Sequence, residues 1–96
     1  MSDTAVLDRP RTLDSDGTGL GETAQVVLWN DSVNSMEHVW DCLMKVFGHS
    51  RQLAWKIMLE AHNKGKAIAE VEGTEEANGH CHELTSLGLR ATVEII

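Results

Sequence analysis

The apolar run from Ala24 to Trp29 constrains the fold of this chain more than any other stretch. It is short and rich in valine, which is typical of a strand buried inside a sheet. The run stops abruptly at two polar residues, Asn30 and Asp31. The rest of the chain therefore has to supply neighbouring strands, and the polar pair at the strand end requires an explanation of its own.

Two later segments show the alternation of apolar and polar residues that is typical of a half-buried strand. The apolar positions are Ala67, Ala69 and Val71 in residues 66–72, and Leu89, Ala91, Val93 and Ile95 in residues 89–96. Together with the first run, these segments predict three strands.

Two helices are predicted between the first strand and the second. Asn34 can cap the first helix, Glu37 completes that cap three residues later, and Gly48 is a natural stop. The second helix is predicted to be capped by Ser50 and to end at Gly65. The inward faces, at helical spacing, are Met36, Val39, Trp40, Leu43, Val46 and Phe47 in the first helix and Leu53, Ala54, Ile57, Met58, Ala61 and His62 in the second.

A third helix is predicted after the second strand, with Thr74 as its cap and Gly88 at its end. Its apolar stripe is Ala77, Cys81, Leu84 and Leu87. The resulting order of elements is βααβαβ. It predicts an α+β fold, a two-layer sandwich in which a three-stranded antiparallel sheet is covered on one face by three helices.

Length and charge limit what such a fold can do. A chain of 96 residues with 42% hydrophobic content supports one small core, which we assign to residues 24–96. Residues 1–23 hold three of the eight glycines and the only proline and show no periodicity, so we expect a flexible N-terminal arm. The formal charge of −7 argues against nucleic acid as a partner.

The cysteines and the absence of long apolar runs predict the compartment. Cys42 and Cys81 form no CxxC unit and are too few for a disulfide framework, so we expect buried thiols in a reducing environment. No leader sequence and no membrane span are recognisable, since a span needs about 20 apolar residues. We therefore expect a cytoplasmic protein, without cofactor or metal, and a monomer as the simplest state.

The polar pair at the strand end can be combined with residues of both helices into one site. Met58 and His62 lie one helical turn apart and share a face. If the two helices pack as a hairpin on the strand, an apolar floor lies beneath a polar rim. The floor is Met36, Val39 and Met58, and the rim is Asn30, Asp31 and His62. Such a site suits a bulky apolar side chain attached to a cation.

At this point the chain resembles a known family. Residues 24–96 are similar to the ClpS family, the adaptor proteins of the bacterial N-degron pathway, and their tryptophans are most like those of actinobacterial members. Three motifs occur in the family's order and spacing: V-x-L-x-N-D from Val26, M-E-x-V from Met36, and M-L-x-x-H-x-x-G-K-A from Met58. The resemblance implies an adaptor without catalytic activity.

The resemblance also implies a role for individual residues. The adaptor would bind proteins that begin with Phe, Leu, Trp or Tyr and deliver them to a Clp AAA+ unfoldase of ClpC or ClpA type, through the unfoldase's N-terminal domain. Asn30, Asp31 and His62 would receive the substrate's α-amino group. Met36 would exclude β-branched N-terminal residues. The remaining pocket positions would be Val39, Met58 and Leu89.

The chain departs from the family pattern at the rim and at the expected unfoldase interface. The family often has a second aspartate where this chain has Ser32, and a threonine where it has Asn34. Ser32 removes a carboxylate from the rim, which affects recognition of the second substrate residue. At the start of the third helix Glu75 matches an acidic family position, but His80 stands where the family has a basic residue.

Three other hypotheses were weighed against this resemblance. An enzyme could use His62 and Asp31 with Ser32 or Cys42 as nucleophile, but no G-x-S-x-G motif is present. A metal site at His80 and His82 is disfavoured, because residues two apart on a helix point in different directions. The βααβαβ order also resembles the C-terminal domain of the ribosomal stalk protein, so a purely structural interaction domain is the main alternative.

Overall fold

The structure, a computed structural model, describes residues 22–96, so the predicted N-terminal arm lies almost entirely outside the described residues. The elements are β2 (Thr23–Trp29), α1 (Met36–Phe47), α2 (Arg51–Lys64), β3 (Lys66–Gly73), α3 (Thr74–Ser86) and β4 (Arg90–Ile95). The predicted order βααβαβ is confirmed.

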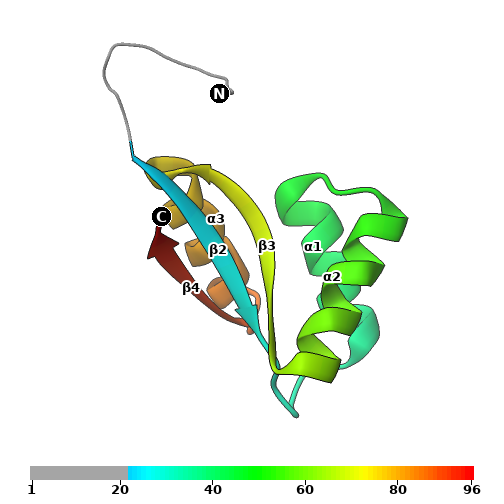
Figure 1. The fold of residues 1–96 in the computed structure, drawn as a ribbon. Helices are drawn as coiled ribbons and strands as arrows, with labels where there is room; N and C mark the ends of the chain where they lie inside the picture. Colours follow the sequence, from blue (N-terminus) through cyan, green and yellow to red (C-terminus); the bar gives the residue numbers. More distant parts are fainter. Residues whose placement is uncertain (1–21) are drawn as a thin grey trace.

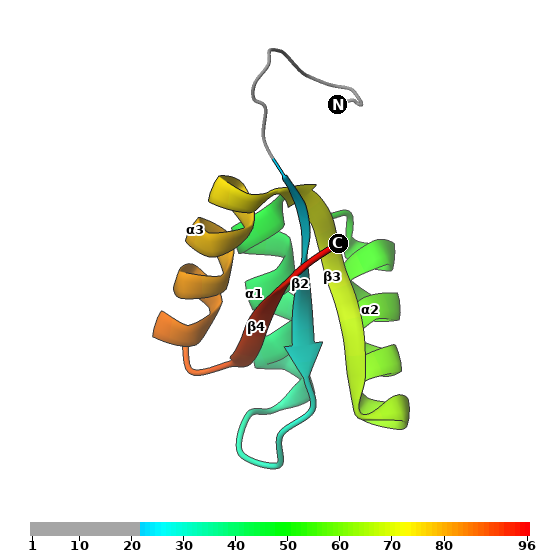
Figure 2. The same ribbon diagram turned by 60° about the vertical axis from the view of Figure 1, so that its left-hand side comes forward.

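The three strands form one antiparallel sheet in the order β3-β2-β4, with the buried strand β2 at its centre. The helices lie on one face of this sheet, and Figure 2 looks onto the other face. In Figure 1, α1 rises from the end of β2 and α2 runs back down beside it. Helix α3 lies against the same face of the sheet, on the other side of β2 from α2. The two-layer α+β sandwich is therefore confirmed.

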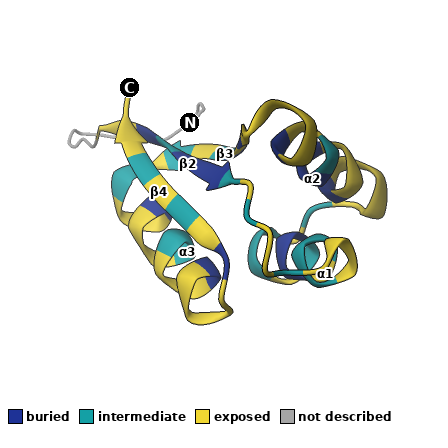
Figure 3. Cartoon of the chain, turned by 90° about the horizontal axis from the view of Figure 1, so that it is seen from below, coloured by how far each residue is buried: buried dark blue, intermediate teal, exposed yellow. Residues whose placement is uncertain are grey.

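The core lies between the sheet and the helices (Figure 3). Its largest members come from every layer: Val26 and Leu28 of β2, Leu43 of α1 and Leu84 of α3 are at most 2% exposed. In α2 the predicted positions Ala54, Ile57, Met58 and Ala61 are buried, but Leu53 is 42% exposed. Leu53 lies about 90° around the helix from the centre of that stripe, since each residue turns the helix by about 100°.

A β-bulge changes the face that β3 presents to the helices. Val26 pairs with Glu70 and Val27 pairs with Ile68, which leaves Ala69 as an extra residue. Beyond the bulge, Glu72 lies on the inner face and Val71 is 50% exposed. The predicted inward position of Val71 is therefore wrong, because one inserted residue reverses the alternation.

The helix ends partly follow the prediction. Ser50 caps α2, and Gly48 and Gly65 end α1 and α2 with positive φ angles of 71° and 93°. The predicted caps Asn34 and Thr74 are wrong. Ser35 caps α1, accepting a hydrogen bond from the backbone N–H of His38 (3.1 Å).

The residue before α3 in the N-cap position is Gly73, which has no capping side chain. Thr74 is the first helical residue, and both its backbone N–H and its hydroxyl donate to the carbonyl of Glu22 at 3.0 Å. Thr74 therefore joins the start of α3 to the start of β2. Its hydroxyl is used for this contact and does not cap the helix.

Candidate functional site

A pocket opens where β2 ends, between the first turn of α1 and the last turns of α2. Its walls come from the strand end, the loop after it and both helices. The lining residues are Leu28, Trp29, Asn30, Asp31, Asn34, Met36, Val39, Met58, Ala61 and His62. It contains about 330 Å³ of space free of protein atoms, part of which is open to solvent.

The structure brings the predicted rim and floor together. Asn30, Asp31 and His62 all line this pocket, as do the apolar residues Met36, Val39 and Met58. Met58 is only 3% exposed, which makes it part of the floor, whereas Met36 is 37% exposed.

Two predicted positions lie elsewhere. Leu89 does not line the pocket; it is 4% exposed and belongs to the core, where its backbone N–H bonds to the carbonyl of Leu84. This bond closes the α3–β4 turn. Ser32 is exposed in the loop and is not a lining residue either.

Three lining residues were missed by the sequence analysis: Leu28, Trp29 and Ala61. Periodicity could have indicated two of them. Leu28 lies two residues before Asn30 along the same strand, and Ala61 follows Met58 at a spacing of three on α2.

The loop after β2 is built around the carboxylate of Asp31. Its Oδ1 accepts hydrogen bonds from the backbone N–H groups of Val33 (2.9 Å) and Asn34 (2.8 Å), which is an Asx turn. The backbone N–H of Asn30 donates to the carbonyl of Gly65 (2.9 Å). These bonds attach the strand end to the loop and to the end of α2, so the pocket mouth has a defined shape.

The same contacts keep Asp31 ionised. Partial burial by itself would raise the pKa of its carboxyl group. The hydrogen bonds from Asn34 and Val33, together with the positive charge of Arg90, outweigh this effect and hold the pKa below its ordinary value. Asp31 is the only carboxylate among the described residues that line the pocket. The mouth therefore carries one fixed negative charge.

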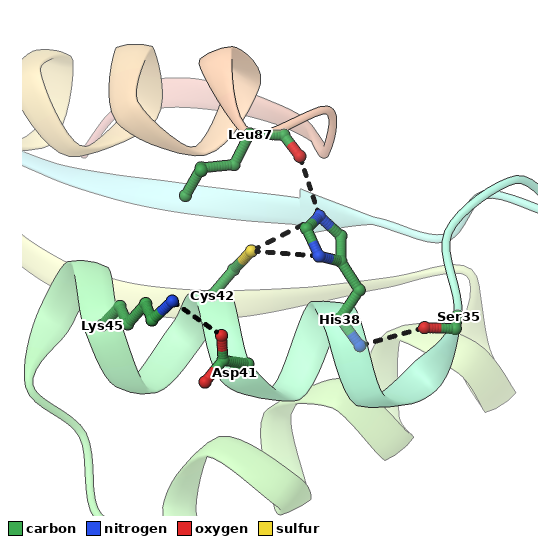
Figure 4. Close-up of polar contacts among 6 residues, drawn as sticks. All are labelled: Ser35, His38, Asp41, Cys42, Lys45 and Leu87. Atoms are coloured by element: carbon green, nitrogen blue, oxygen red, sulfur yellow. Dashed lines mark hydrogen bonds and ion pairs between the residues drawn. The ribbon is translucent and has the colours of Figure 1, made fainter.

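The structure does not assemble a catalytic group around His62. Cys42 is 2% exposed inside the core, and its sulfur lies 3.6 Å from Nε2 of His38 (Figure 4). Burial raises the pKa of the Cys42 thiol, and the charge of Asp41 raises it further while Lys45 opposes it. Neither Ser32 nor Cys42 lies in the pocket beside His62.

Within residues 22–96, no three His, Cys, Asp or Glu side chains are placed to hold a metal ion. His80 is already engaged, since its Nδ1 lies 2.7 Å from a carboxylate oxygen of Glu72. Both cysteines are free thiols, and Cys81 is partly buried. None of the described helices is long and apolar enough to cross a membrane.

The second group of predicted residues lies at the opposite end of the sheet from the pocket. The start of α3 contacts Glu22, just before β2, whereas the pocket forms at the end of β2. Glu75 is exposed in the first turn of α3, and the ring of His80 packs edge-on against Phe47, with 4.9 Å between centroids. The molecule therefore has two separated candidate surfaces.

A small pocket with an apolar floor, and with one carboxylate, two amides and one imidazole among its lining residues, is typical of a small binding domain. The comparisons with known proteins agree with this class. Residues 21–92 match the family described as ATP-dependent Clp protease adaptor protein ClpS, and the chain belongs to that family.

Curated relatives and a solved structure support this assignment. The ClpS adapter of Mycobacterium tuberculosis H37Rv is 37% identical over 68 residues, which is 71% of this chain and 67% of that protein. The ClpS adapter of Nocardia farcinica is 35% identical over 68 residues, covering 71% and 64%. The structure of Agrobacterium tumefaciens ClpS2 bound to L-phenylalaninamide matches with a TM-score of 0.77 and 29% identity, covering 80% of this chain and all of that one.

Proposed function

We propose that this adaptor binds proteins whose N-terminal residue is Phe, Leu, Trp or Tyr and delivers them to a Clp AAA+ unfoldase for degradation. The observation that supports this proposal most is the pocket itself. Its apolar floor ends directly at Asn30, Asp31 and His62, so an apolar side chain and an ammonium group can be bound side by side.

The ligand of the Agrobacterium protein has the same two features. L-phenylalaninamide carries an aromatic side chain and a free α-amino group, and its amide stands for the first peptide bond of a longer chain. In the present pocket the side chain would contact Val39 and Met58. The ammonium group would then face the negative charge of Asp31 and the side chains of Asn30 and His62.

Magnitudes explain why both halves of the pocket are needed. Burying a Phe or Leu side chain contributes about 1.5–3 kcal/mol, and a hydrogen bond to a charged group contributes about 1.5–3 kcal/mol. Micromolar affinity requires about 8 kcal/mol net of the cost of association. An internal phenylalanine lacks the ammonium group and leaves Asp31 without its partner, so we expect it to be rejected.

Met36 is the residue that would select against branching. It is the first residue of α1, it lines the pocket, and it is the more exposed of the two lining methionines. In this position its side chain would crowd the β-carbon of the bound residue. N-terminal Ile and Val, which branch at that carbon, would be excluded.

Delivery would use the opposite end of the sheet. The exposed Glu75 and the partly buried His80, five residues further along α3, would form the expected contact with the N-terminal domain of a ClpC- or ClpA-type unfoldase. Because this surface is separated from the pocket, a monomeric adaptor could hold its substrate and its unfoldase at the same time.

Fluorescence anisotropy with labelled peptides tests the pocket. We expect the protein to bind a peptide that begins with Phe and to bind the N-acetylated form of the same peptide at least tenfold more weakly, which corresponds to about 1.4 kcal/mol. Peptides beginning with Ile should bind weakly to the wild type and several-fold better to Met36→Ala.

Equal binding of the free and acetylated peptides would refute the proposal. The structural interaction domain, similar to that of the ribosomal stalk, would then be the better explanation. Unchanged discrimination against Ile in Met36→Ala would show that Met36 only contributes to packing.

A further inference from the structure

We propose that Asn34 is a positioning residue of the pocket, whose side-chain amide orients the carboxylate of Asp31 toward an incoming ammonium group and fastens it to the α3–β4 turn. This inference rests on the proposed function. It assigns to Asn34 a role that neither helix capping nor direct contact with the substrate describes.

Both hydrogens of the Asn34 side-chain amide take part in hydrogen bonds. Its Nδ2 donates to both carboxylate oxygens of Asp31, at 3.2 Å and 3.0 Å, and to the carbonyl of Gly88 at 2.8 Å. An amide NH₂ has two hydrogens, so one points to the carboxylate and the other to the turn. Both partners can only accept, which fixes the nitrogen, and not the oxygen, on this side.

The bonds to Asp31 differ between its two oxygens. Oδ1 accepts from the backbone of Val33, the backbone of Asn34 and the Asn34 side chain. Within residues 22–96, the Asn34 side chain is the one hydrogen-bond donor to Oδ2. A carboxylate oxygen can accept more than one hydrogen bond, so Oδ2 retains capacity for an ammonium group. The Asx turn fixes the backbone, and the side-chain amide fixes the rotation of the carboxylate.

The charges around this carboxylate make its orientation important. Arg90, from β4, is the cation whose charge acts on Asp31, and His62 of α2 lines the same pocket. Among the described residues that line the pocket, Asp31 is the one carboxylate. Electrostatic attraction of a substrate's ammonium group therefore depends on Asp31, and on the residue that holds it.

His38 offers a matched control. Its Nε2 donates to the carbonyl of Leu87 at 2.8 Å, so it fastens α1 to the same α3–β4 turn that Asn34 contacts through Gly88 (Figure 4). His38 has no hydrogen bond to Asp31, and it does not line the pocket. Loss of either side chain weakens the attachment of the turn, but only the loss of the Asn34 side chain removes hydrogen bonds from the carboxylate of Asp31.

The experiment compares Asn34→Ala with His38→Ala in the full chain. The pKa of Asp31 is measured by carbon NMR of its carboxyl group in the free protein, and affinity is measured with free and N-acetylated Phe peptides. We expect Asn34→Ala to raise the pKa of Asp31 and to weaken binding of the free-amine peptide about tenfold, with little change for the acetylated one. His38→Ala should leave both readouts as in the wild type, although it lowers the free energy of unfolding.

The outcomes separate this inference from the proposed function. A wild type that binds both peptides equally refutes the proposed function, while the titration of Asp31 still reports on the Asn34 contact. A wild type that prefers the free amine, with an Asn34→Ala variant that keeps both the pKa of Asp31 and this preference, overturns the inference. An equal loss of peptide affinity in Asn34→Ala and His38→Ala, without a change in the pKa of Asp31, overturns the inference as well. Should Asn34→Ala not fold, Asn34→Ser, which keeps a short donor, is expected to change both readouts in the same direction.

Discussion

The two ends of the sheet carry the same chemical group under opposite conditions. At the pocket end, Asp31 accepts hydrogen bonds from Val33 and Asn34, and its pKa is held below the ordinary value. At the far end, Glu72 is hydrogen-bonded to His80, yet its pKa is raised. One carboxylate is stabilised in its charged form and the other is not.

The difference comes from burial and from neighbouring charges. Burial is the largest influence on Glu72, and the negative charges of Glu70 and Glu76 add to it, so that the contact with His80 offsets only part of the cost. For Asp31 the hydrogen bonds and Arg90 outweigh a smaller effect of burial. A carboxylate that stays charged and partly open suits the binding of a cation, whereas Glu72 suits a structural contact between β3 and α3.

The largest expected effect follows from removing the charge at the pocket end. In Asp31→Asn the side-chain oxygen can still accept from the backbone N–H groups of Val33 and Asn34, so the Asx turn is retained, while the charge and the bond from the Asn34 side chain to Oδ2 are lost. We expect affinity for a free-amine Phe peptide to fall between tenfold and about a hundredfold, the size of one or two charge-assisted hydrogen bonds.

The dependence on pH gives a second readout of the same substitution. Because the pKa of Asp31 is held below its ordinary value, its contribution to binding should be complete at neutral pH and should decline only as the pH falls through that lowered pKa. Anisotropy across this range should show the decline in the wild type and not in Asp31→Asn. An unchanged affinity at neutral pH in the variant would contradict the role of the charge.

A smaller expected effect concerns the far end. Glu75→Lys reverses the charge of an exposed side chain in the first turn of α3. We expect peptide affinity within twofold of the wild type, but weaker binding to the N-terminal domain of the unfoldase, measured by calorimetry or by degradation of a reporter that begins with Phe. Equal loss of both activities would show that the two ends do not act separately.

The smallest expected effect is on stability. Glu72 has a raised pKa in the folded protein, so its contribution to stability is complete below about pH 4.5 and is lost as the pH rises through the folded value. Glu72→Gln removes this charge, and at neutral pH we expect the free energy of unfolding to stay equal or rise by less than about 1 kcal/mol. Denaturant titration with peptide binding as control measures it. A clear destabilisation would mean that the charged contact with His80 dominates.

Much of the fold could be predicted because it depends on local patterns. Strands, helices and their glycine ends follow from periodicity and from backbone preference, as Gly48 and Gly65 show. The bulge at Ala69 could not be predicted in this way, because the extra residue is defined by its pairing with β2. The carbonyl of Ala69 accepts a hydrogen bond from His49, in the loop between α1 and α2, at 2.8 Å. That contact is distant in the sequence.

The candidate site, like the fold, could be predicted where it depends on local spacing and not where it depends on contacts between distant parts of the sequence. The polar residues at the end of β2 and the pair Met58 and His62 are visible as local spacings, and the structure places them in one pocket. The sequence suggests a helix cap for Asn34, since asparagine is common there. Its actual partner, Gly88, lies 54 residues away in the chain. No local pattern indicates such a contact.

For the proposed delivery of substrates, the seven residues of β2 set a distance. At about 3.3 Å per residue, the strand separates the pocket from the start of α3 by roughly 20 Å. An extended chain spans at most about 3.3–3.6 Å per residue, so six or seven residues, roughly, are needed to cover that length. A folded protein with a shorter free N-terminus could occupy the pocket and still fail to reach an unfoldase docked at α3. The length of the substrate's unstructured leader would then decide which bound proteins are degraded.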